Sequence, residues 1–362
     1  MSTDAGSTTS MFFPFNKLKT IDSVTSLHHG HHGETNTFTI IIIFIIFMNL
    51  KTILDGFSDS IPIKTTKNIK IIKDVLVYLL VCDRLNVFVI APPSVGAKSS
   101  MSRFFVDIIP DRFFLISGTG SITKAGVRDR IVEVGRRKGL LFFDEVHNAP
   151  PDVKKLLYDL LQFHRVQIIK KMGFRTITSD IQVYCNILAT ANPIDSYWTM
   201  YGDINKMKEQ IPLDQVIMRR FHLVIPVDDY NLKEFGEICS DMGKNINKEE
   251  LINKIETFIK ASKEIEVIQK EIPKYVVDYL MKLKENNDYL LFPVTPELKV
   301  AITELAKGTA RLSTLLNPKK YKEYVEKGIV IKDEHWKFAI EFFNRTLKQY
   351  MPENIFNKYF KL

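Results

Sequence analysis

The stretch that most constrains the fold of this chain is an apolar run followed by two acids. Leu140–Phe143 is uniformly hydrophobic, and Asp144 and Glu145 follow it directly. Such a run is typical of a strand buried on both faces, as in a parallel sheet covered by helices. The two carboxylates then lie at the carboxyl end of the strand, where open α/β sheets bind ligands. On this stretch alone, a strand end capped by solvated acids is an equally good interpretation.

The composition is that of an ordinary globular protein. The chain has 362 residues, of which 45% are hydrophobic and 25% are charged, which allows two domains. The net charge of +8 is compatible with a polyanionic partner such as nucleic acid but does not establish one. The 3 cysteines lie far apart without metal-ligand spacing, so we expect a reducing, cytoplasmic location.

Residues 1–37 are rich in Ser, Thr, Gly and His, which predicts disorder. The histidine tract from His28 to His32 could bind a metal ion, although a flexible polar tail is the simpler interpretation. The apolar run Phe38–Met48 is shorter than the roughly 20 residues that span a bilayer, so we expect no stable transmembrane span. We interpret residues 1–47 as an extension from an upstream start, with a membrane-associating anchor as the alternative.

Strands and helices alternate over residues 48–228, which predicts an α/β fold: a three-layer αβα sandwich around a parallel sheet. Residues 229–350 are charged and helical in pattern, which predicts a separate all-α domain before a tail at 351–362. The expected strands are Val87–Ile90, Phe113–Ile116, Leu140–Phe143, Tyr184–Thr190 and Phe221–Pro226. The expected helices cover 50–85, Lys98–Ile109 and Pro151–Phe163, and Val166–Arg175 reads as a hairpin turning near Gly173.

A candidate phosphate loop follows the strand that ends at Ile90. Such a loop needs inward-pointing backbone N–H groups, a lysine for the outer phosphates and a hydroxyl for Mg²⁺. The candidate nucleotide-binding residues are Val95, Gly96, Ala97, Lys98, Ser99 and Ser100. The strict pattern fails, because Pro92 and Ala97 replace its two glycines; Ala97 fits only if its backbone is helical. A plain loop is the alternative.

The order of these motifs resembles the ATPase module of minichromosome maintenance (MCM) helicases and their relatives among the AAA+ ATPases. Pro92–Ser99 resembles the phosphate loop of that family, and Asp144–Glu145 resembles its acidic strand end. Ala189–Pro193 resembles the sensor strand. Met218–His222 resembles the arginine-finger motif, in which His222 replaces an aspartate. The resemblance implies a P-loop AAA+ fold in which a nucleotide domain, 48–228, precedes a helical lid, 229–350.

The resemblance also implies roles for particular residues, with ATP and Mg²⁺ as cofactors. Ser99 and Asp144 would hold Mg²⁺, and Glu145 and Asn192 would orient the attacking water. Arg220, or the adjacent Arg219, would be a finger that acts on the nucleotide of a neighbouring subunit. A finger acting in trans implies a ring, either a homo-hexamer or another ring oligomer.

Two insertions complete the resemblance. Ser121–Val127 resembles the start of the helix-two insert, and Ile168–Phe174 resembles a hairpin that faces DNA. Lys170 and Lys171 would contact DNA there, although a solvated strand edge explains them equally well. The lid arginine of the family should fall near Glu297, an acid, with Lys299 the nearest base.

These features predict an ATP-hydrolysing MCM-like protein that acts as a DNA helicase or DNA-remodelling motor in replication. Two alternatives are a MoxR-type ATPase that remodels proteins and a degenerate subunit that binds nucleotide without hydrolysing it. A third alternative is that the nucleotide is GTP and not ATP, because no residue in the sequence indicates which base is recognised.

Overall fold

The computed structural model describes residues 50–61, 63, 67–118, 123–172, 175–240 and 248–360, all within the compact unit Ile43–Leu362. The predictions for residues 1–47 lie outside the described residues. Within the described part of the chain, no helix is both long and apolar enough to cross a membrane.

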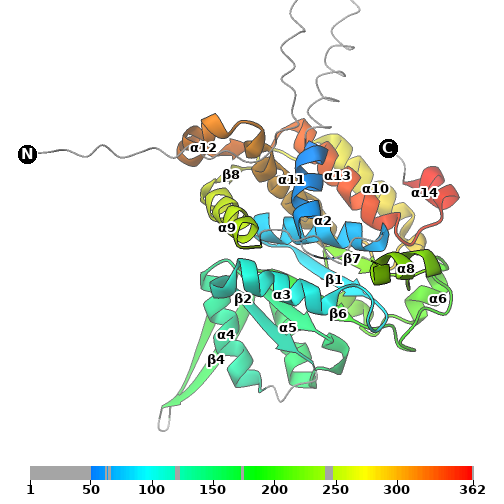
Figure 1. Cartoon of the computed structure of the whole chain (residues 1–362). Coiled ribbons are helices and arrows are strands. Elements are labelled where there is room, and N and C mark those ends of the chain that lie inside the picture. Colours follow the sequence, from blue (N-terminus) through cyan, green and yellow to red (C-terminus); the bar gives the residue numbers. More distant parts are fainter. Residues whose placement is uncertain are drawn as a thin grey trace, which may run out of the picture. The chain divides into compact units, whose positions relative to one another are not determined.

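A five-stranded parallel sheet lies beneath most of the helices (Figure 1). Its strand order is β2-β3-β6-β1-β7, and every neighbouring pair is parallel. The strands are β1 (Asn86–Ile90), β2 (Phe113–Ser117), β3 (Leu140–Asp144), β6 (Asn186–Ala191) and β7 (Leu223–Pro226). The three central strands are almost wholly buried, because each consists mainly of the apolar runs seen in the sequence. The predicted α/β class and parallel sheet are confirmed.

Helices connect the strands and cover the sheet. They are α3 (Lys98–Ile108), α4 (Lys124–Arg136), α5 (Pro151–Phe163), α6 (Ile204–Glu209) and α7 (Gln215–Met218). α3 contacts β2, and α4 contacts β2, β3 and α5. In α5, Val153, Leu156, Leu157, Leu160 and Leu161 are buried, as the three- and four-residue spacing predicts. Of the segment that resembles the helix-two insert, Lys124–Val127 begins α4, whereas Ser121 and Ile122 lie outside the described residues.

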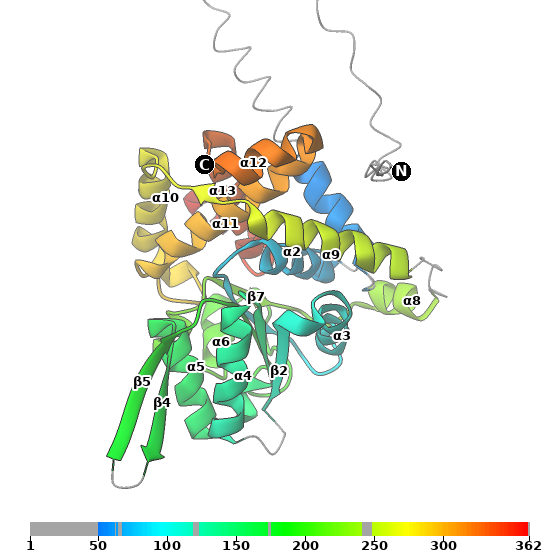
Figure 2. The same ribbon diagram turned by 90° about the vertical axis from the view of Figure 1, so that its left-hand side faces the viewer.

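The hairpin predicted before the sensor strand consists of β4 (Arg165–Met172) and β5 (Arg175–Gln182). The two strands are antiparallel, with Arg165 opposite Gln182 and Met172 opposite Arg175. Gly173, where the turn was expected, lies outside the described residues. In both ribbon views the hairpin projects beyond α4 and α5 (Figures 1 and 2).

The C-terminal region is helical, as predicted. Its helices are α8 (Leu232–Ser240), α9 (Lys248–Glu264), α10 (Lys274–Glu285), α11 (Glu297–Ser313), α12 (Tyr321–Lys327), α13 (Asp333–Leu347) and α14 (Glu353–Tyr359). One detail was not predicted: β8 (Val267–Ile268) and β9 (Ile329–Val330) form a parallel pair. Two residues are too few to show a strand period, and the pair lies beside a small cluster of Ile265, Ala310 and Ile329.

Helix α2 (Lys67–Val81) precedes the sheet in the sequence but packs against α11. The Tyr78 hydroxyl lies 2.8 Å from Thr309 Oγ1, and a Cβ on Gly308 would lie 2.7 Å from Cys82 Sγ. Arg345 on α13 donates to the buried Asp74 over 2.9 Å. These contacts explain why nearly all of α2 is buried, and they attach the helical region to the segment that leads into β1.

Candidate nucleotide site

The loop between β1 and α3 is tightly folded. It leaves β1 beside β6, since the Ala91 N–H donates to Ala191 O over 3.0 Å. The Val95 N–H then donates to Pro92 O over 3.1 Å, which closes a turn. Pro92 therefore acts as an acceptor, and its missing N–H costs nothing there. Gly96 has φ +76°, and a Cβ on it would lie 2.6 Å from Ala91 Cβ, so the position requires glycine.

Ala97 corrects one expectation from the sequence. Its φ of 53° and ψ of 30° are left-handed, not right-handed helical. A non-glycine residue in this region costs about 1–2 kcal/mol, and such strain is typical of functional sites. α3 begins at the next residue, Lys98, with no side-chain cap on its first turn. Ser99 and Ser100 are exposed on that turn. The positive end of an 11-residue helix therefore faces outward beside the loop.

Lys98 joins the loop to two strand ends. Its Nζ donates to Asn192 Oδ1 over 2.5 Å, just beyond the end of β6. Burial lowers the pKa of the Lys98 ammonium, while the charges of Asp144 and Glu145 act in the opposite direction. The structure thus brings the ammonium, both carboxylates and the Asn192 amide to one edge of the sheet.

Asp144, the last residue of β3, is held by a neighbour that the sequence analysis did not assign a role. Its Oδ1 accepts a 2.5 Å hydrogen bond from Thr190 Oγ1, and the Glu145 N–H donates to the same hydroxyl over 3.2 Å. Thr190 is fully buried in β6. A threonine within an otherwise apolar stretch, Ile187–Ala191, was the available signal for this role.

Glu145 has a left-handed backbone, with φ 50°. Gly118 permits its position, because a Cβ there would lie 2.1 Å from Glu145 O. The Glu145 carboxylate accepts a hydrogen bond from Asn148 Nδ2 over 3.4 Å. His147 also adjoins the site and was not anticipated. Burial lowers the pKa of its imidazole, which is therefore neutral near pH 7.

Arg220 lies at the other edge of the sheet. Its carbonyl accepts a hydrogen bond from Asn86 Nδ2 over 3.3 Å, at the start of β1, whereas the candidate phosphate loop follows the end of β1. A five-residue strand separates the two by about 13 Å, so Arg220 does not join Lys98 and Asp144. A finger that acts on the nucleotide of a neighbouring subunit must lie away from the phosphate loop of its own chain, as Arg220 does.

Glu297, at the position where a lid arginine was expected, is an ion-pair partner of Arg220. Arg220 Nη1 lies 3.4 Å from Glu297 Oε1, and Arg84 Nη2 lies 3.8 Å from Glu297 Oε2. Lys299, the nearest base in the sequence, is exposed, and so is the adjacent candidate finger Arg219.

His222 has a structural role where the related motif has an aspartate. Its ring Nδ1 accepts a hydrogen bond from the backbone N–H of Asn86 over 3.1 Å, and its backbone N–H donates to Asn86 O over 2.8 Å. Complete burial lowers its pKa to about 3, so the imidazole is neutral. Lys170 and Lys171 lie near the end of β4, opposite Ile177 and Thr176. In the sequence, both lysines lie about 20 or more residues from the candidate nucleotide-site residues Lys98, Asp144, Glu145 and Asn192.

A parallel sheet in this strand order, with a lysine-bearing loop after β1 and paired acids at the end of β3, two strands away, defines the P-loop AAA+ class. Comparison with known proteins agrees: residues 78–242 match the family model of the MCM P-loop domain. The chain therefore has the P-loop AAA+ fold, and residues 78–242 are similar to the MCM P-loop domain.

Curated relatives are more distant. The chain is 23% identical over 180 residues to the Holliday junction branch migration complex subunit RuvB of Mycoplasma genitalium, covering 49% of this chain and 53% of that protein. It is 25% identical over 211 residues to RuvB of Thermotoga petrophila, covering 57% and 58%. The chain thus spans about half the length of the curated relatives that it matches.

Proposed function

We propose that this chain binds and hydrolyses ATP with Mg²⁺ and uses the reaction to move along DNA or to remodel a DNA complex. The observation that carries this proposal is the convergence of Lys98 with Asp144 and Glu145 at the carboxyl edge of the sheet. MCM-type P-loop domains are generally nucleotide-binding, and AAA+ proteins commonly form oligomers.

The residues present suit a magnesium–triphosphate ligand. Mg²⁺ prefers oxygen ligands, and the Ser99 hydroxyl and the Asp144 carboxylate supply them. Thr190 donates to Oδ1 of Asp144, and no other group in the described part of the chain donates to Oδ2. When bound, the metal would neutralise charge on the phosphates. Residues Val95–Ser100 would hold the phosphates through their backbone N–H groups, and Lys98 would add its ammonium group.

The remaining residues would assist the reaction itself. Glu145 would orient the attacking water and accept its proton, with Asn148 holding the carboxylate and Asn192 as a second contact for the water. Arg220 would act on the nucleotide of the neighbouring subunit in a ring, such as a homo-hexamer, because it lies at the opposite edge of its own sheet.

Two observations favour DNA over protein as the substrate. The projecting hairpin has Lys170 and Lys171 near the end of β4. The curated relatives are named for migrating branches of Holliday junctions, which are DNA. A MoxR-type protein-remodelling activity is the alternative for the same site.

The test is phosphate release by the purified chain, with and without DNA, together with a Glu145→Gln variant. The variant should bind a fluorescent ATP analogue as the wild type does but hydrolyse ATP at least about 100-fold more slowly, because it lacks the carboxylate that polarises water. Glu133→Gln, which removes a surface carboxylate on α4, is the control and should keep the wild-type rate.

An unchanged rate in Glu145→Gln would refute the assignment. Stimulation by DNA supports a DNA motor, whereas its absence supports action on protein. The same assay with GTP compares the two nucleotides.

A nucleotide-binding subunit without turnover is a second candidate. The ion pair between Arg220 and Glu297 favours it, because this pair engages the candidate finger within its own chain. Tight nucleotide binding by the wild type, with no phosphate release in any condition, would identify this case.

A further inference from the structure

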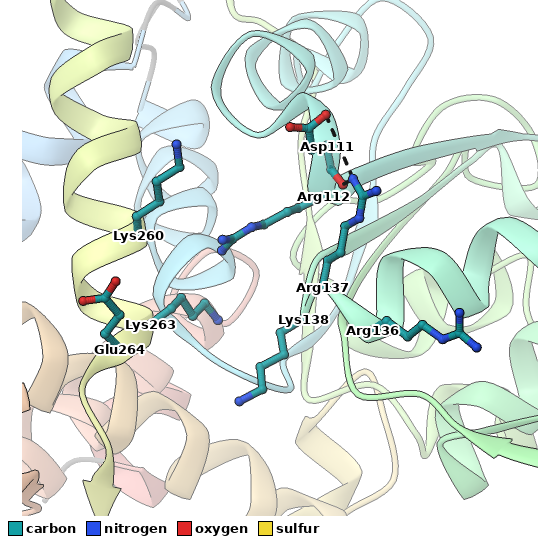
Figure 3. A pocket seen from close by; sticks show the side chains of 8 residues that line it. All are labelled: Asp111, Arg112, Arg136, Arg137, Lys138, Lys260, Lys263 and Glu264. Atoms are coloured by element: carbon teal, nitrogen blue, oxygen red, sulfur yellow. Dashed lines mark hydrogen bonds and ion pairs between the residues drawn. The ribbon is translucent and has the colours of Figure 1, made fainter.

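A basic pocket lies at the amino edge of the sheet, beside α9 (Figure 3). It is open and has a volume of about 620 Å³. It combines residues from the turn just before β2, from the end of α4 and the segment that follows it, and from the last turns of α9. Six lining residues are basic: Arg112, Arg136, Arg137, Lys138, Lys260 and Lys263. Two are acidic: Asp111 and Glu264.

Arg136, Arg137 and Lys138 are adjacent in the sequence, whereas the other cations of the pocket come from distant parts of the chain. A Cβ on Gly139 would lie 2.0 Å from Arg112 O, so glycine at this position lets the start of β2 approach the segment after α4. Helix α9 then brings Lys260 and Lys263 to the opposite wall, more than one hundred residues later in the chain.

Carboxylates in and around the pocket form ion pairs with three of its six cations: Arg137 with Glu133, Lys260 with Glu256, and Lys263 with Asp83. Arg137 donates to Asp111 O over 2.7 Å, and its Nη1 lies 4.0 Å from Asp111 Oδ1. Glu264 accepts a hydrogen bond from the Tyr321 hydroxyl over 2.9 Å. Lys260 pairs with Glu256 over 2.6 Å. Lys263 lies 3.4 Å from Asp83 and also donates to Cys82 O.

The side chains differ in where they point. Arg112 and Lys263 extend toward each other across the pocket, and Lys138 enters the same space, whereas Arg136 points away (Figure 3). Among the described residues, Arg112 has no ion-pair partner within 4 Å. Several like charges around one opening repel one another, so an anion between them would be favourable.

This pocket is separate from the candidate nucleotide site. Lys138 lies two residues before β3, whereas Asp144 is the last residue of β3, so the strand places them about 13 Å or more apart. The inference therefore does not depend on the proposed ATPase activity.

We propose that this pocket binds phosphate groups, with Arg112, Lys138 and Lys263 as the principal contacts. A guanidinium matches the geometry of phosphate oxygens, and lysine ammonium groups add charge without a fixed geometry. The phosphates could come from a nucleic-acid backbone or from a free oligophosphate, and the two are separated by experiment.

The test uses the full chain with Lys98→Ala, Lys170→Ala and Lys171→Ala, so that neither the phosphate loop nor the hairpin contributes lysines. Inorganic tripolyphosphate is titrated by calorimetry, and a fluorescent single-stranded oligonucleotide by anisotropy over a range of salt. Arg112→Gln and Lys138→Gln are compared with Arg136→Gln, which removes the same charge from the side chain that points away. Thermal unfolding monitors the fold of each variant.

We expect Arg112→Gln and Lys138→Gln each to weaken at least one probe about tenfold. For the oligonucleotide, each should also lower the slope of log affinity against log salt by about one. Arg136→Gln should stay within about twofold of its parent. The probe that responds identifies the source of the phosphates. Binding of neither probe, or an equal loss of affinity in Arg136→Gln, would overturn the proposal. If Arg112→Gln unfolds, the comparison rests on Lys138→Gln, because Lys138 is at an exposed position.

Discussion

The hydrogen bond that the buried His222 side chain accepts depends on the protonation state of its imidazole. Its Nδ1 accepts the backbone N–H of Asn86, and the imidazole is completely buried. A proton on Nδ1 would replace this acceptor with a donor that faces another donor. The related motif has an aspartate at this position, which also accepts hydrogen bonds. In this chain the start of β1 therefore depends on the acceptor that His222 supplies.

Acidification should therefore destabilise the fold. The pKa of His222 is about 3 in the fold and near 6.5 when unfolded. Between these values the unfolded chain binds the extra proton, so stability is greatest above about pH 6.5 and falls as the pH drops. Lowering the pH to 5 should cost about 2 kcal/mol from this residue. His164 and His335, both with pKa values lowered to about 4, act in the same direction.

Urea unfolding at several pH values measures this loss. His222→Asn keeps an oxygen acceptor but does not titrate, so its stability should depend less on pH by about the same 2 kcal/mol. An identical pH dependence in the variant and the wild type would show that His222 is not the titrating group.

At the scale of secondary-structure elements, the close packing of α2 against α11 links the helical region to the sheet. Gly308 allows the two helices to approach, because a Cβ there would lie 2.7 Å from Cys82 Sγ and 3.0 Å from Tyr78 Cδ1. Arg311 extends the contact by donating to Val81 O over 2.6 Å and to Asp83 over 2.7 Å. The segment that enters β1 is thereby attached to α11.

Two glycine-to-alanine variants should have opposite effects. Gly308→Ala should lower the free energy of unfolding by about 2 kcal/mol, because the added methyl group overpacks the contact between α2 and α11. Gly236→Ala on α8 is the matched control, since a Cβ there meets nothing within 4 Å. It should stabilise the chain by up to about 1 kcal/mol through helix propensity. Chemical unfolding measures both, and a neutral Gly308→Ala would mean that the two helices can move apart without cost.

At the scale of the whole molecule, the separation of Arg220 from Lys98 and Asp144 limits what one chain can do. They lie at opposite edges of the sheet, and Arg220 instead pairs with Glu297 of its own chain. If Arg220 is the finger, a single chain has an incomplete site, and hydrolysis requires a neighbour whose nucleotide competes with Glu297 for the guanidinium.

Mixing two inactive variants tests this directly. Arg220→Ala keeps its own site but has no finger for its neighbour, whereas Glu145→Gln keeps the finger but has no water-orienting carboxylate. Each alone should be nearly inactive, and random mixing should restore up to about a quarter of the interfaces. Phosphate release against mixing ratio measures this recovery. Mixtures no more active than their components would exclude a finger acting in trans.

The sequence by itself determined the strands and helices around the sheet, because their signals are local. The apolar run at Leu140–Phe143 predicted a buried strand, and the spacing of leucines in Pro151–Phe163 predicted a one-sided helix. It also indicated that Asp144 and Glu145 lie at the carboxyl end of their strand, where open α/β sheets bind ligands. The domain boundary at 228 stays a prediction.

Only the tertiary structure decided which side chains became partners across long intervals of sequence. Thr190 holds Asp144 from 46 residues away, and Arg220 meets Glu297 from 77 residues away. The basic pocket likewise forms only where α9 lies beside the start of β2. Periodicity reports which face of an element is buried, but not which other element covers that face. These contacts therefore depend on the packing of the complete fold.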